Sequence, residues 1–198
     1  MPRLTRAESQ ARTRAQLLTT ARELFLRDGY QPTSLDKVAE AAGFSKGAVY
    51  SNFRGKDELC MAVLDEIRAE HAMEIVEVLR APNTEERLRR FEVWAERVIG
   101  DPQWTTLELE FGVHAGRDPQ LREELARRIS AFSSTAGAAV TSVADSDGIT
   151  PAIPAEELGV ALLAMGVGVG LGLFRSIAPE TPVRALVDTV RVLAGLPR

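Results

Sequence analysis

The chain has 198 residues, 45% hydrophobic and 26% charged, which is long enough and apolar enough to fold around a sizeable core. Its single cysteine, Cys60, excludes an intramolecular disulfide framework and a cysteine-rich zinc site. The first residues are charged and lack the apolar stretch of a signal peptide. We therefore expect a cytoplasmic protein with no metal and no cofactor.

The net charge of −4 conceals two parts of opposite sign. Residues 1–56 contain ten Lys or Arg and five Asp or Glu, whereas residues 57–198 contain fourteen and twenty-three. A small basic module followed by an acidic body is typical of a nucleic-acid-binding protein whose remaining chain binds partners or dimerises. We place the domain boundary between residues 56 and 57.

The basic part begins with a predicted amphipathic helix. Apolar residues recur at helical spacing from Ala11 to Arg27, and Gly29 ends the helix. Four arginines near its start form either an arm that reaches the minor groove or the DNA backbone, or a merely solvated segment: Arg3, Arg6, Arg12 and Arg14.

Two further short helices are predicted to follow around a tight turn. Thr33 and Ser34 offer N-cap hydroxyls, and Asp36 completes a capping box with Thr33. Gly43 breaks the second helix after about two turns, and Ser45 caps the third. Two short helices around a glycine turn are the helix-turn-helix pattern.

The rest of the sequence is helical almost throughout, with proline and Asp-Pro positions between the segments. No β-branched segment of period two stands out. The predicted helices are Asp57–Arg80, Thr84–Ile99, Gln103–Ala115, Pro119 to about Val143, Ala155–Ser176 and Pro182–Leu193. The predicted fold class is therefore all-α, with about nine helices.

The third helix has the residue types that a recognition helix needs. Small side chains permit close approach to base edges, lysines supply positive charge, and polar side chains supply hydrogen bonds. The predicted DNA-binding residues are Thr33, Ser34, Ser45, Lys46, Gly47, Ala48, Tyr50, Ser51, Asn52 and Lys56. A structural hairpin with incidental lysines is the alternative, but caps, turn, small residues and basic positions all agree with DNA binding.

The same region resembles the DNA-binding domain of the tetracycline-repressor (TetR/AcrR) family over residues 13 to about 64. The resemblance rests on the runs Ala21-Arg22-Glu23-Leu24-Phe25, Gly29-Tyr30, Thr33-Ser34-Leu35, Val38-Ala39, Ala42-Gly43, Ser45 to Phe53 and Lys56-Asp57-Glu58-Leu59. The stretch from Glu108 to Leu125 also looks like a segment of many family members. Ser51 and Asn52 stand where the family often carries bulkier residues, which leaves the operator sequence open.

The resemblance implies a homodimer in which a fourth helix joins three DNA-reading helices to a helical body. By the same resemblance, Tyr50 and Lys56 contact phosphate and Phe53 anchors the core. Residues 57–198 then form an effector-binding and dimerisation domain.

An effector pocket is one interpretation of the apolar and aromatic residues of the body, and ordinary core packing is the other. The residues in question are Trp104, Leu107, Phe111, His114 and Phe132. Glu110 lies one turn before His114, but a Glu and His pair supplies too few ligands for a metal site. The effector is predicted to be an unidentified, largely apolar small molecule.

The uncharged run from Leu158 to Phe174 is at the lower length limit of a membrane span, and its alternating glycines weaken it as an isolated helix. Small residues at four-residue spacing also permit close packing of helices at a dimer interface. We favour the interface, with no membrane partner, and predict that it contains Leu162, Gly166, Gly170, Phe174, Val187 and Val190.

The resulting hypothesis is a homodimeric, ligand-responsive repressor that binds a palindromic double-stranded DNA operator. An enzyme is the first alternative, but the sequence has no G-x-S-x-G, no P-loop and no nucleophilic cysteine with a neighbouring base. We therefore predict no catalytic residues. An all-α scaffold with an incidentally basic start is the second alternative, and the salt dependence of DNA binding distinguishes it.

Overall fold

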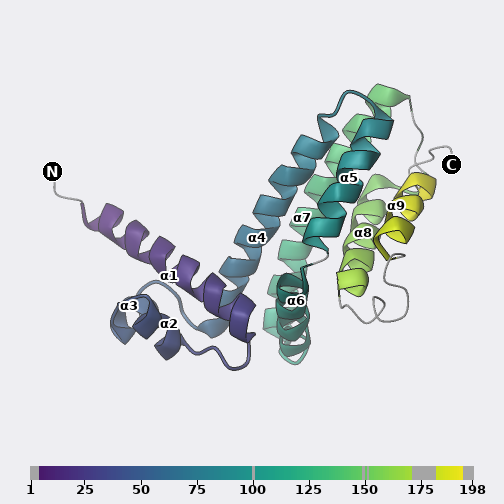
Figure 1. The fold of residues 1–198 in the computed structure, drawn as a ribbon. Coiled ribbons are helices and arrows are strands. Elements are labelled where there is room, and N and C mark those ends of the chain that lie inside the picture. The colour runs from purple at the N-terminus through teal and green to yellow at the C-terminus, as the bar shows by residue number, and fades with distance from the viewer. Residues whose placement is uncertain (1–4, 100, 149, 151, 171–181, 194–198) are drawn as a thin grey trace.

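The computed structural model describes residues 5–99, 101–148, 150, 152–170 and 182–193, and within them the chain forms nine helices and no strand. The helices are α1 (Arg6–Asp28), α2 (Leu35–Ala41), α3 (Lys46–Tyr50), α4 (Lys56–Leu79), α5 (Thr84–Val98), α6 (Pro102–Ala115), α7 (Pro119–Asp147), α8 (Ala155–Gly170) and α9 (Pro182–Leu193). The predicted all-α class is confirmed. Figure 1 shows α1, α2 and α3 at one end, with α4 leading from them into a bundle formed with α5 to α9.

Helix α1 begins earlier than the sequence pattern predicts, because a capping box holds its start. The Thr5 hydroxyl accepts a hydrogen bond from the Glu8 backbone N–H at 3.2 Å, and the Glu8 carboxylate accepts one from the Thr5 N–H at 2.7 Å. The hydrogen bond from the Thr5 backbone N–H lowers the pKa of Glu8. Arg12 and Arg14 therefore lie on a helix rather than on an extended arm, and Arg3 is outside the described residues.

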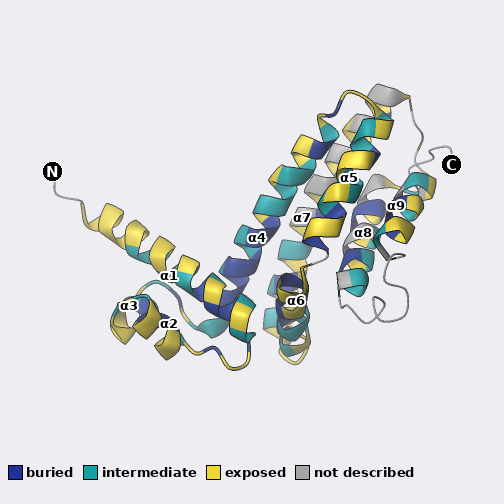
Figure 2. Ribbon diagram, in the orientation of Figure 1, coloured by how far each residue is buried: buried dark blue, intermediate teal, exposed yellow. Residues whose placement is uncertain are grey.

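One apolar core runs from the three N-terminal helices into the body. Phe25 of α1, Val49 of α3, Leu64 of α4 and Phe111 of α6 are all buried in the same cluster. Figure 2 shows the N-terminal half of α4 mostly buried, whereas the first turns of α1 are exposed. The core is therefore continuous across the predicted domain boundary.

Close helix contacts in the body depend on small residues. A Cβ added at Gly159 of α8 would lie 3.0 Å from the main-chain oxygen of Ser133, so α7 and α8 touch nearly backbone to backbone. Gly166 of α8 lies against the side chain of Ile99, where an added Cβ would be 3.6 Å from Cδ1. No helix in the described part of the chain is long and apolar enough to cross a membrane.

A buried ion pair joins α4 to α6. The Arg68 guanidinium donates two hydrogen bonds to the Glu108 carboxylate, at 2.9 and 2.7 Å. The two side chains are only 5% and 11% exposed. Asp65 contacts Arg68 and is also bonded to Arg128 of α7, so three helices share one charged network. Buried charges require partners of this kind, because an unpaired charge in a protein interior is strongly destabilising.

Candidate nucleic-acid interface

Helices α2 and α3 form a helix-turn-helix, and a serine caps the N-terminus of each helix. The Ser34 hydroxyl accepts from the Lys37 N–H, and the Ser45 hydroxyl accepts from the Ala48 N–H, each at 3.2 Å. Gly43 in the turn has a φ of +71°, a left-handed conformation that other residues adopt only at a cost. The caps and the glycine together fix where each short helix starts and stops.

The predicted capping by Thr33 is wrong. Thr33 is only 1% exposed, and its hydroxyl donates to the main-chain oxygen of Gly29 at 2.8 Å. Ser34 is the N-cap of α2 instead, and the residue three positions later is Lys37 rather than Asp36, so no capping box forms there. The Thr33 side chain thus joins α1 to α2. Because it is buried, it is not positioned for the DNA contact that the sequence predicted.

The outer surface of α3 carries most of the other predicted contact residues. Tyr50 is 59% exposed, and Lys46, Gly47 and Ser51 are also exposed. Figure 2 shows α2 and α3 largely exposed at the end of the molecule. Lys46 forms an ion pair with Asp36 of α2. Such an exposed pair contributes little to stability, so the lysine can exchange the carboxylate for a phosphate.

Ser51 and Asn52 close the last turn of the recognition helix. The Ser51 hydroxyl and the Asn52 side-chain amide both donate to the main-chain oxygen of Ala48, at 2.9 and 2.7 Å. The Asn52 side-chain oxygen is buried with no hydrogen-bond partner among the described residues. These two residues, the least predictable from the sequence, therefore serve the helix end as well as its surface.

Lys56 lies at a junction of charged and aromatic groups. Its ammonium is 4.0 Å from the centre of the Tyr30 ring and donates to the main-chain oxygen of Gln31 at 3.1 Å. Burial lowers the pKa of Lys56. Burial, followed by a hydrogen bond to Asp57, raises the pKa of Tyr30. Lysine has three N–H donors, so two remain for the predicted phosphate contact.

Helix α6 contacts this junction from the body. The Glu110 carboxylate accepts a hydrogen bond from the Tyr30 backbone N–H at 2.6 Å, and His114 Nε2 lies 3.2 Å from the Asp57 carboxylate. The His114 and Tyr30 rings are 4.9 Å apart. The sequence placed His114 at the edge of an effector pocket. In the structure, its ring lies beside Asp57 of α4 and Tyr30 instead.

Sequence reasoning missed two cations near the helix-turn-helix. Lys37 on α2 is exposed, and its ammonium donates to the main-chain oxygen of Pro32 at 2.7 Å. The Arg54 side chain is 94% exposed and forms an ion pair with Glu58. Their positions next to the predicted recognition helix could have identified both as candidate DNA contacts.

The other predicted effector residues are mainly core. Leu107 and Phe111 are fully buried, and Trp104 is buried in the same cluster. Phe132 is described only by its backbone. Leu107 also lines a small hollow of about 260 Å³ between the end of α1 and the start of α6. The packing interpretation therefore describes these side chains better than an open pocket does.

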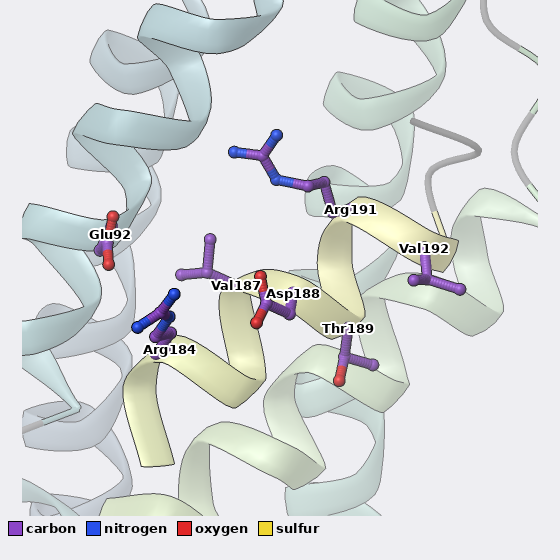
Figure 3. Close-up of a pocket in the computed structure, with 7 residues that line it drawn as sticks. All are labelled: Glu92, Arg184, Val187, Asp188, Thr189, Arg191 and Val192. Atoms are coloured by element: carbon purple, nitrogen blue, oxygen red, sulfur yellow. The ribbon is translucent and has the colours of Figure 1, made fainter. Parts of the chain in front are cut away.

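A larger hollow, of about 750 Å³, lies between α5 and α9. Figure 3 shows Glu92 of α5 on one side and the remaining lining residues on α9: Arg184, Val187, Asp188, Thr189, Arg191 and Val192. Of these, only Val187 belongs to a predicted site, the dimer interface. It is buried within its own chain.

The predicted dimer-interface residues are either buried within the chain or not described by their side chains. Gly166 packs against Ile99 of the same chain, so it and Val187 present little surface to a second copy. Phe174 lies outside the described residues, and only the backbone is described for Leu162, Gly170 and Val190. Val160 and Ala164 of α8 are exposed at four-residue spacing, and Gly168 has open space around its Cα.

Two capped helices around a glycine turn, joined to an all-α body, define a helix-turn-helix protein. Residues 17–63 match the family described as bacterial regulatory proteins, tetR family. The HTH-type transcriptional regulator TtgR from Pseudomonas putida is 41% identical over 71 residues, which cover 36% of this chain and 33% of TtgR. The match therefore spans about a third of that relative.

Longer matches extend into the body at lower identity. The HTH-type transcriptional repressor AcnR from Corynebacterium efficiens is 25% identical over 154 residues, 74% of this chain and 73% of AcnR. The crystal structure of the reduced form of NemR from E. coli superposes with a TM-score of 0.72 at 20% identity, covering 93% of this chain and 98% of NemR. The N-terminal residues of this chain are therefore similar to the tetR family of bacterial regulatory proteins, and the whole chain shares the fold of NemR.

Gly43→Ala should lower the free energy of unfolding by about 1 to 2 kcal/mol, because alanine is strained in the left-handed conformation. Gly47→Ala is the matched control. Its φ is not positive, and the nearest atom to an added Cβ is the Ser45 hydroxyl oxygen at 3.8 Å. This second change should be neutral or stabilise by up to about 1 kcal/mol. Urea unfolding of both variants measures the difference, and equal destabilisation would contradict the turn geometry.

Proposed function

We propose that the chain is a transcriptional repressor that binds a palindromic operator as a homodimer. The observation that carries the proposal is the exposed surface of α3, where Lys46 and Gly47 lie at the serine-capped start of the helix and Tyr50 at its end. Small residues at that end admit base edges, and the neighbouring cations bind phosphates. The excess of basic residues in 1–56 supplies the electrostatic attraction that the acidic remainder lacks.

A dimer would give this surface its symmetry. Two recognition helices separated by about 34 to 36 Å meet successive major grooves on one side of the duplex. The second copy would pack on the exposed side of α8 that carries Val160, Ala164 and Gly168. Apolar and small residues on a helix surface favour such close packing, and α8 has no described charged residue in this stretch.

Regulation by a small molecule would act through α6. In this helix Glu110 is bonded to Tyr30 at the DNA-binding end, and His114 and the buried Glu108 are bonded to α4. Its Trp104 indole N–H is buried without a hydrogen-bond partner among the described residues, as is the Ser133 hydroxyl of α7. An effector with a hydrogen-bond acceptor would pair with such a donor, and it must bind one arrangement of α6 more tightly than another to shift the protein.

Tyr50→Ala should weaken binding to an operator obtained by selection from random duplexes by about fivefold or more, because one polar contact at a DNA interface is removed. The fold should persist, since the side chain is mostly exposed. Fluorescence anisotropy over a series of salt concentrations measures both affinity and slope, and wild-type binding should weaken steeply as salt rises. Met73→Ala, also at an exposed site, is the control.

Unchanged affinity of Tyr50→Ala would remove Tyr50 from the interface. A wild-type protein that enriches no sequence in the selection would contradict the proposed function itself. Activity in a reporter strain then separates repression from activation, because deletion of a repressor raises expression from the operator-bearing promoter.

Val160→Glu should convert the dimer into a monomer, because it places a charge on the proposed apolar contact. Light scattering at several protein concentrations gives the mass. Val113→Glu, on an equally exposed site of α6, should leave the mass unchanged. A dimeric Val160→Glu protein would move the interface elsewhere, and a monomeric wild type would refute the dimer.

Trp104→Phe should reduce the stabilisation that an effector gives, because it removes the unpaired N–H and retains the aromatic ring. Compounds that raise the Tm of the wild type would be identified first and then tested on the variant. Trp94→Phe is the matched control, since the Trp94 N–H already donates to Glu74 at 2.9 Å. Equal Tm shifts in all three proteins would place the effector away from Trp104.

A further inference from the structure

An arginine of the first helix holds the far end of the recognition helix. Arg14 of α1 donates from Nη1 to the main-chain oxygen of Asn52 at 2.5 Å. Its guanidinium carbon also lies 4.0 Å from the centre of the Phe53 ring. Asn52 and Phe53 directly follow Ser51, the C-cap of α3. The Arg14 side chain therefore contacts the two residues that follow the C-cap of the recognition helix.

The other polar side-chain contacts at that end of α3 are local, since Ser51 and Asn52 bond to Ala48 of the same helix. The helix is five residues long, and Val49 is its only buried residue. Helices this short are not stable in isolation, so tertiary contacts must set their position. Ser45 holds the first turn and Phe53 anchors the exit in the core. Arg14 is the side chain that ties the exit back to α1.

Arginine suits this role better than a neutral side chain. Its bond to a main-chain carbonyl is charge-assisted, and a guanidinium over an aromatic ring adds a cation–π attraction. Arg14 forms no ion pair among the described residues, although its charge contributes to the lowered pKa of Glu58, and its direct contacts are the Asn52 oxygen and the Phe53 ring. Arg14 is half-buried, and these two contacts hold its guanidinium against the residues that follow α3.

We propose that Arg14 is a positioning residue that sets the orientation of α3 and thereby the discrimination between the operator and other DNA. This inference rests on the proposed function. Because base readout requires side chains to be placed accurately in the groove, a displaced α3 loses specific contacts first. Binding through phosphates tolerates the same displacement, since it does not depend on sequence.

The test compares Arg14→Met with Arg12→Met on a selected duplex and on a scrambled duplex of equal length. Both variants remove one positive charge from α1 and keep a good helix former. Arg12 is exposed and has no hydrogen bond or ion pair among the described residues. Binding is measured over a salt series, which gives affinity, the ratio of the two affinities and the slope.

Arg14→Met is expected to weaken binding to the selected duplex by about tenfold, and to the scrambled duplex by less than about twofold, with a wild-type salt slope. Arg12→Met is expected to change both affinities by the same factor. If Arg14→Met keeps the wild-type ratio, or if its slope falls by about one, Arg14 is a phosphate contact or a bystander and the inference is overturned. Equal loss of discrimination in Arg12→Met overturns it too.

Hydrogen exchange separates a local effect from general unfolding. In Arg14→Met, the amides of residues 48–53 should exchange faster, while those of the buried part of α4 keep their protection. Faster exchange throughout the chain, or no change in 48–53, would refute the positioning role. A wild-type protein that binds both duplexes equally would instead refute the proposed function, and the Arg14 inference with it.

Discussion

The first half of α4 is the element on which the rest of the structure depends. Leu59, Val63 and Leu64 are completely buried there, and they lie in the same apolar cluster as Phe25 of α1 and Phe111 of α6. Each such side chain contributes about 1.5 to 3 kcal/mol when it is removed from water. The helix-turn-helix end and the body therefore share their main source of stability, and a movement of either disturbs the packing of the other.

The polar contacts around this core fix the orientation of its helices relative to one another. The Arg68–Glu108 pair ties α4 to α6, and Arg22 of α1 forms two hydrogen bonds with Glu70 on the same helix as Arg68. Apolar packing alone tolerates small rotations between helices, whereas a buried bidentate pair permits little change in geometry. A shift of α6 in the body must consequently move α4 or break a buried pair.

Local signals in the sequence were sufficient for most of the fold. Apolar periodicity and proline positions located α4, α5, α6 and α9 to within about one residue, because those helices have clear start and stop signals. Helix α1 was placed too late, since the capping pair Thr5 and Glu8 precedes its apolar pattern. Thr33 was misjudged because a hydroxyl at a helix start can cap it or bond elsewhere, and only packing decides.

The site was predictable in position but not in detail. The basic residues and the small turn indicate α3, yet the sequence does not reveal that Lys46 is paired with Asp36 or that Arg14 reaches Asn52. Such contacts join residues distant in the chain, and spacing carries no information about them. Sequence spacing is equally uninformative in the body. Trp104 and Phe111 are residue types that often line pockets, but in the structure both are buried in the core.

The contact between Glu110 and Tyr30 spans 80 positions of the chain, and Phe111 is part of the cover over the same tyrosine. During synthesis the first 56 residues leave the ribosome well before the residues that complete their core. At a translation rate of about 5 to 20 residues per second, that interval lasts several seconds. For this time Tyr30 lacks the side chains of α6 that pack against it, so the packing around Tyr30 is completed only after α6 has emerged.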